Sequence, residues 1–325
     1  MFLTHLLDRA SPHTWGVLIV GSGVVLLSID SLLIRLLTQS LPFTNVIFWR
    51  GVGTAVGFSL LAWLATRHGV RRMFFTIGRA GLAVAALNVV GNVLFVIAIT
   101  HTTVAHALVI TAMAPVLTAI LAQFLLGERA SGRIWLVAIV VAVGVGLVFL
   151  AIPSQGDLIG DLAAAGGAVF LSLNFVLLRR AKQVNMIPAF AIGGVLTAIA
   201  AAPFVSRFSL SPREGAIAFV LGVVVLPLSF GLVLRGFRYL QAPEVSLLIL
   251  LEVILGPLWV LLVLHETPDL RTVLSGSVIL IALAGNTLAD WAQLRNQRVR
   301  FALPAGDVHD GAMPAPDIVQ QRGGK

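Results

Sequence analysis

Apolar stretches of about 20 residues recur along this chain, and they limit its fold more than any other feature. A helix of that length crosses the roughly 30 Å hydrocarbon layer of a bilayer. A soluble domain needs a more polar surface, because charged residues make up about 25% of ordinary globular chains. Here they make up 11%, against 58% hydrophobic residues. The sequence therefore predicts an all-α integral membrane protein surrounded by lipid.

Ten such runs can be placed, joined by short connections that Pro or Gly often marks. The first run has full spanning length and no small-residue cleavage site, so we interpret it as a retained helix rather than a signal peptide. The polar tail at 293–325 is predicted to be disordered. The ten runs cover residues 16–37, 44–66, 79–99, 105–126, 133–152, 159–179, 187–205, 215–235, 243–264 and 271–292.

The basic residues predict how the chain crosses the membrane. With the segment 1–15 in the cytoplasm, 17 of the 22 Lys and Arg residues fall on the inner side, as the positive-inside rule requires. Both termini are then cytoplasmic. The net charge of +8 lies in short loops rather than on one helix face, so no nucleic-acid partner is expected. The five remaining basic residues are Arg35, Arg50, Arg207, Arg213 and Arg271.

The chain also resembles itself. Residues 98–150 align with residues 236–288 at an offset of 138 positions, which pairs "LLGERASGRIWL" with "VLHETPDLRTVL". We therefore expect two five-helix units, 16–152 and 159–292, and an odd number of spans makes the second unit inverted. Inverted repeats are typical of secondary transporters, which bind substrate near the bilayer midplane between the halves. A chance match between apolar helices is the alternative.

Two stretches resemble a known family: "AHALVITAMAPVLTAILAQFLLGER" (105–129) and "APEVSLLILLEVILGPLWVLLVLHE" (242–266). Together with the Arg of "FWRGVG", they are similar to the ten-helix EamA-type members of the drug/metabolite transporter superfamily. The second stretch departs from the family pattern, with Val253 in place of Pro and His265 in place of Gly.

The resemblance implies a ten-helix bundle around a central cavity, in the bacterial inner membrane, without a cofactor. It also implies that small solutes move by alternating access, with export as the usual direction. The oligomeric state is not predicted.

Asp30 and Arg50 lie inside the first two runs, where lipid does not solvate them. One Asp and one Arg near the centre of a membrane helix together raise the free energy of insertion by roughly 5 to 7 kcal/mol. Asp30 lies about 10 Å and Arg50 about 9 Å below the same membrane surface, at the helical rise of 1.5 Å per residue. We therefore expect them to form an ion pair that faces the cavity. The alternative is a pair that only fixes the helix hairpin. Arg35 lies near the helix end and is the poorer partner.

Further candidates lie near the midplane. Glu252 has no basic residue in its own run, and apolar surroundings favour the neutral form of a carboxyl group, as a proton-coupling site requires. A purely structural carboxyl group is the alternative. Asn88 and Asn92 share one helix face and are candidate site residues, although interhelical hydrogen bonding is the commoner role. Trp259 is a candidate for the cavity wall, and Asn174 and Asn286 are weaker candidates.

Other residues have structural interpretations. Pro115, Pro227 and Pro257 are expected to kink their helices, while Gly53 and Gly57 are spaced for close helix contact. His101 and His106 lack a third ligand, so we expect solvated or gate residues and no metal site.

The predicted function is secondary active transport of small metabolites such as amino acids, with protons as the candidate coupling ion. Arg50 could then meet a carboxylate and Glu252 an ammonium group. A passive channel is the alternative. An intramembrane enzyme is disfavoured, because "GSG" at 21–23 lacks the basic residue of a phosphate loop and "HETPD" at 265–269 lacks the second His of a zinc motif.

Overall fold

The computed structural model describes most of the chain, and within the described residues every regular element is a helix. Seven helical segments are long and apolar enough to cross a membrane, and two shorter apolar helices span Leu251–Leu264 and Thr272–Ala282. Three segments lie largely or wholly outside the described residues: the expected run at 133–152, most of the connection after residue 65 and the tail 293–325. The described residues are 12–65, 77–127, 135–136, 139–141, 143–144, 146, 158–181, 183–240, 242–268, 270, 272–282 and 285.

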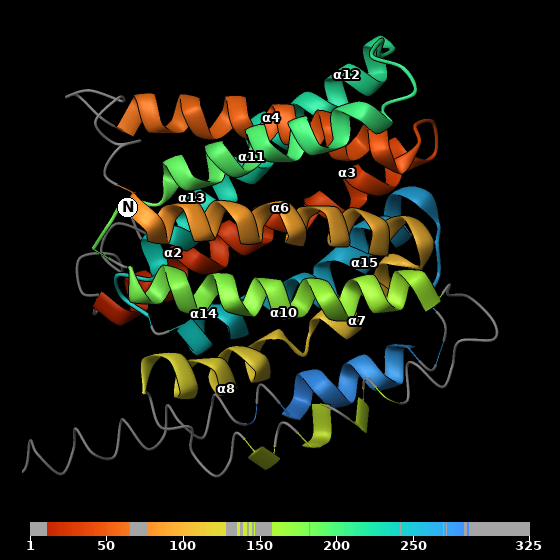
Figure 1. Ribbon diagram of the computed structural model, residues 1–325. Coiled ribbons are helices and arrows are strands. Elements are labelled where there is room, and N and C mark those ends of the chain that lie inside the picture. Colours follow the sequence, from red (N-terminus) through yellow and green to blue (C-terminus); the bar gives the residue numbers. More distant parts are fainter. Residues whose placement is uncertain are drawn as a thin grey trace, which may run out of the picture. The chain divides into compact units, whose positions relative to one another are not determined.

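Four helices match the expected runs closely and are continuous. Each begins and ends within a few residues of the position predicted from the apolar pattern, and α11 is followed by the short 3₁₀ turn η1 (Ala202–Phe204). Figure 1 shows these four helices lying side by side, in agreement with their contacts. They are α4 (Phe43–Ala65), α6 (Gly78–His101), α10 (Leu158–Arg180) and α11 (Ile187–Ala201).

Four further runs are each divided into two parts. α2 and α3 meet at Ser28, α7 and α8 at residues 112–113, and α14 and α15 at Leu250. The fourth run passes through the π-helical segment η2 (Val220–Val225). The parts are α2 (Pro12–Leu27), α3 (Ile29–Thr38), α7 (Val104–Thr111), α8 (Ala114–Leu126), α12 (Pro212–Phe219), α13 (Leu226–Gly236), α14 (Ala242–Ile249) and α15 (Leu251–Leu264).

Two of the three predicted kink residues lie directly after an interruption. Pro115 is in the first turn of α8 and Pro227 in the first turn of α13, where a missing backbone N–H is tolerated. Pro257 lies inside α15, whose helix continues through it. The interruption of that run is at Leu250, seven residues earlier.

Glycines bring α4 into close contact with two neighbouring elements. A Cβ atom on Gly53 would lie 2.7 Å from the Cα atom of Gly222 in η2, and one on Gly57 would collide with the ring of Pro227. A Cβ atom on Gly51 would lie 2.7 Å from the backbone nitrogen of Ala198 in α11. The predicted role of Gly53 and Gly57 is confirmed. This packing fixes the segment of α4 that carries Arg50.

Candidate functional site

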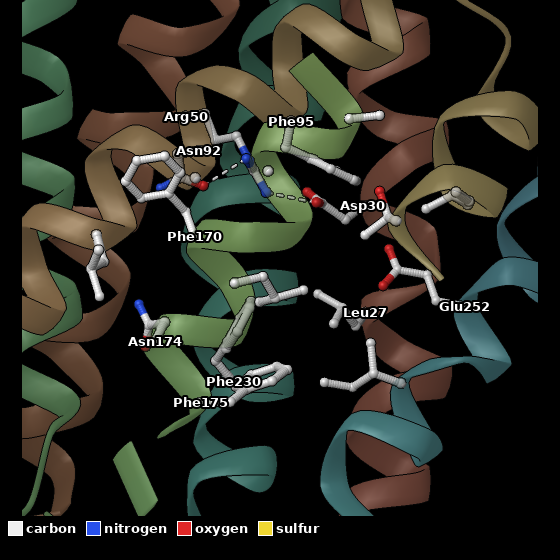
Figure 2. Close-up of a pocket in the computed structure, with 18 residues that line it drawn as sticks. Leu27, Asp30, Arg50, Asn92, Phe95, Phe170, Asn174, Phe175, Phe230 and Glu252 are labelled. Carbon is white, nitrogen blue, oxygen red and sulfur yellow. Dashed lines mark hydrogen bonds and ion pairs between the residues drawn. The ribbon is translucent and has the colours of Figure 1, made fainter. Parts of the chain in front are cut away.

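A cavity of about 110 Å³ lies among the helices. Its wall is formed by α2, α3, α4, α6 and α7 from the first part of the chain and by α10, α13, α14 and α15 from the second. The charged residues in this wall are Asp30, Arg50 and Glu252 (Figure 2). The remaining surface is mostly apolar, as is usual for a small-molecule site that orients its ligand with few polar groups.

Arg50 is the centre of a buried polar cluster. Its Nη2 donates to Asp30 Oδ2 at 2.6 Å, and its Nη1 donates to Asn92 Oδ1 at 2.7 Å. The guanidinium carbon also lies 5.6 Å from the centre of the Phe95 ring, within the range of a cation–π contact. The expected Asp30–Arg50 ion pair is therefore present, and it faces the cavity.

Burial makes this ion pair costly to disturb. Arg50 is 4% exposed and Asp30 is 2% exposed, and removal of one partner leaves an uncompensated charge that costs about 3–5 kcal/mol. Asp30 lies in the first turn of α3, where the helix dipole favours a negative charge. The poorer candidate, Arg35, instead donates from Nε to Glu266 Oε2 at 2.9 Å.

Glu252 has no comparable partner. It is 8% exposed, lies in the first turn of α15 and makes no hydrogen bond within the described residues. Figure 2 shows its carboxylate pointing into the cavity beside Asp30. The second oxygen of Asp30, Oδ1, also lacks a hydrogen-bond partner there. The cavity wall thus contains two carboxyl groups and one guanidinium.

Asn286 lies outside the described residues, and the other predicted site residues divide into two groups. Asn92 and the weaker candidate Asn174 line the cavity. Asn88 does not line the cavity. It packs against α11, where a Cβ atom on Gly193 would lie 3.1 Å from the Cβ atom of Asn88. Trp259 is also outside the wall: its Nε1 donates to Ser28 Oγ at 2.9 Å. Trp259 therefore ties α15 to the interruption between α2 and α3.

Sequence reasoning missed the aromatic part of the wall. Phe95, Phe170, Phe175 and Phe230 line the cavity, although in an apolar helix a Phe gives no sign of facing anything but lipid. One signal was available. Phe95 follows Asn92 by three positions and Phe170 precedes Asn174 by four, so each shares a helix face with a polar residue.

His106 is not a solvated residue. It is 3% exposed, and its Nε2 lies 3.3 Å from Asp161 Oδ1 in the first turn of α10. The solvated interpretation of His106 is wrong because the turn before α7 packs against the start of α10, where Gly160 contacts His101 and Thr102. Within the described residues, no group of three or more ligating side chains suits a metal ion.

Apolar helices around a cavity with a buried ion pair define a membrane protein of the solute-transport class. The chain belongs to the EamA-like transporter family, whose model matches residues 14–150 and again 158–288. It is therefore a member of the drug/metabolite transporter superfamily, as its sequence motifs indicated. Family membership indicates a transporter rather than an enzyme.

Individual relatives agree with this class. The chain is 24% identical over 275 residues to the pseudopaline exporter CntI of Pseudomonas aeruginosa, covering 82% of this chain and 94% of the relative. It is 28% identical over 182 residues to an S-adenosylmethionine uptake transporter of Rickettsia bellii, covering 55% and 61%. A protein crystal structure matches with a TM-score of 0.64 and 20% identity, covering 84% of this chain and 96% of that one. This last likeness concerns the fold alone.

Proposed function

We propose that the protein is a secondary active transporter that exports small amphipathic metabolites, such as amino acids, by alternating access with proton coupling. The observation that carries the proposal is the cavity between the two parts of the chain. Its wall holds the Asp30–Arg50 ion pair, hydrogen-bonded to Asn92, and the unpartnered carboxylate of Glu252. Buried charges within a membrane protein mark substrate or ion pathways, because they are too costly to retain without such a role.

Two internal correspondences support a repeated architecture of ten helices. α7 shifted by 138 positions gives 242–249, which are the bounds of α14, and the same shift carries the end of α8 to the end of α15. It also carries Gly127, with φ of +71°, to His265, with φ of +56°. Both helices thus end in a left-handed residue, which commonly closes a helix. These correspondences favour two equivalent units over 16–152 and 159–292, which we propose to be inverted.

The interruptions suggest how the site could change access. Asp30 follows Ser28 by two positions, and Glu252 follows Leu250 by two positions. Each acid therefore lies in the first turn after an interruption and faces the same cavity. Discontinuous helices beside a midplane site are typical of transporters in which one half rocks against the other. An unpartnered carboxyl group such as Glu252 is the natural place for a coupled proton.

The test is transport by the purified protein in sealed liposomes. Radiolabelled amino acids and other small metabolites would be screened with and without an imposed pH gradient. We expect saturable uptake that responds to the gradient, together with exchange of external for internal solute. Flux that neither saturates nor exchanges would favour the passive channel, and no flux above that of protein-free liposomes for any solute would contradict the proposal.

A further inference from the structure

The free hydrogen-bonding groups in the cavity wall are mainly acceptors. Among the described lining residues, Asp30 Oδ1 and Asn174 Oδ1 are buried without a hydrogen-bond partner. The carboxyl group of Glu252 is a further acceptor in the same wall. On Arg50 only Nε lacks a partner, since both Nη atoms already donate to Asp30 and Asn92. A ligand that brings donors therefore satisfies more of these buried atoms than one that brings acceptors.

The charges of the wall favour the same ligand. Arg50 is the one basic residue among the described lining residues, and its charge is paired with Asp30 at 2.6 Å. Glu252 adds a second carboxylate that no basic residue of the wall contacts. The phenylalanines Phe95, Phe170, Phe175 and Phe230 also line the cavity, and aromatic faces attract cations. A ligand carboxylate would meet a guanidinium that is already held and a carboxylate that repels it.

We propose that this cavity selects its solute through a protonated amine, which Glu252 and Asp30 bind, and does not require a carboxylate on the solute. An ammonium group offers three N–H donors to the free acceptors. Arg50 then acts as a positioning residue that holds Asp30 and Asn92. This role differs from the one expected from sequence alone, in which Arg50 contacts a carboxylate of the solute. The inference rests on the proposed transport function and names the chemical class of its solute.

The experiment compares the two halves of leucine. Isoamylamine keeps the branched hydrocarbon and the amine, whereas isocaproate keeps the hydrocarbon and the carboxylate. Binding of tritiated isoamylamine to the purified full chain in detergent would be measured by scintillation proximity, because weak bases leak across liposomes. We expect unlabelled isoamylamine to displace the label at least about tenfold better than isocaproate or isoamyl alcohol, since hydrogen bonds to charged groups commonly contribute that factor.

A matched pair of variants tests the assignment to Glu252. Glu252→Gln preserves the shape of the side chain and removes its charge, so the affinity for isoamylamine should fall about tenfold or more. Glu244→Gln is the control, because Glu244 lies outside the cavity wall and contacts His13 at 3.2 Å. This control should bind isoamylamine as the wild type does.

Three results would overturn the inference: equal or better displacement by isocaproate, no binding of isoamylamine to the wild type, or unchanged affinity in a folded Glu252→Gln variant. The first two results are measured on the wild-type protein, so the proposal can be tested even if Glu252→Gln does not fold. Gradient-driven uptake of metabolites that lack an amine, but not of amines, would overturn this inference while leaving the transport proposal intact. Absence of all solute flux would count against the transport proposal itself.

Discussion

Asp30 and Arg50, 20 positions apart on successive membrane runs, are joined by a 2.6 Å ion pair at the wall of a cavity between the two parts of the chain. The guanidinium of Arg50 contacts a third helix as well. Arg50 also holds Asn92 of α6, so three helices meet at one guanidinium. Asp30 in turn presents a free oxygen beside Glu252.

Removal of either partner should impair both stability and transport. Arg50→Ala and Asp30→Ala should each lower solute uptake at least tenfold and destabilise the protein by about 3–5 kcal/mol, because a buried charge is left unpaired. The double variant should be less destabilised than the sum of the two single changes. Uptake in liposomes and thermal unfolding in detergent are the measurements. Arg213→Ala, at an exposed position of α12, is the control, and wild-type uptake by both single variants would end the interpretation.

Glu252 should determine the response of transport to a pH gradient. Glu252→Gln removes the group that takes up and releases a proton, so solute uptake should lose its dependence on the imposed gradient. Exchange of labelled for unlabelled solute should continue at saturating solute concentration, because exchange needs no net proton movement. Glu244→Gln should retain the wild-type response. A Glu252→Gln variant that still responds normally to the gradient would exclude the coupling role.

The contact between α4 and η2 should not tolerate a side chain. Gly53→Ala places a Cβ atom 2.7 Å from the backbone of Gly222, and overpacking of this kind costs about 1–3 kcal/mol. Gly21→Ala is the matched control, since its Cβ atom would meet nothing within 4 Å. Thermal unfolding of the two variants should therefore separate them clearly. Equal stability would mean that α4 can shift without cost.

His265 should be a strained position. Its φ of +56° belongs to the left-handed region, which costs residues other than Gly about 1–2 kcal/mol. His265→Gly should therefore stabilise the protein by up to about 1 kcal/mol after the entropy cost of Gly is included. Gly127→Ala, at φ of +71°, should do the reverse. Denaturation of both variants tests this, and a less stable His265→Gly variant would show that its side chain makes a compensating contact.

The predicted orientation can be tested directly because the chain contains no cysteine. Single cysteines introduced near residue 5 and near residue 315 should both react with a membrane-impermeant maleimide only after the cells are opened. A cysteine in the connection at 153–157 should react in intact cells. Labelling of the two termini from opposite sides would contradict an even number of spans.

The sequence by itself determined the class of the protein and predicted the depth of its charged groups. Apolar runs of about 20 residues have one stable solution in lipid, a helix that satisfies its own backbone. Depth along such a helix follows from residue number, so the equal depths of Asp30 and Arg50 were enough to predict their ion pair. The family motifs depend on residue order alone and needed no coordinates.

Only the tertiary structure decided which faces meet. These helices are apolar on nearly all sides, so the sequence does not encode which side faces lipid and which faces protein, as an amphipathic helix would. Whether Asn88 lines the cavity, whether Trp259 reaches Ser28 and whether His106 is buried against Asp161 all depend on helix rotation and on neighbours distant in sequence. Those choices come from close packing between helices, because lipid itself provides no hydrophobic drive to bring one particular apolar face against another.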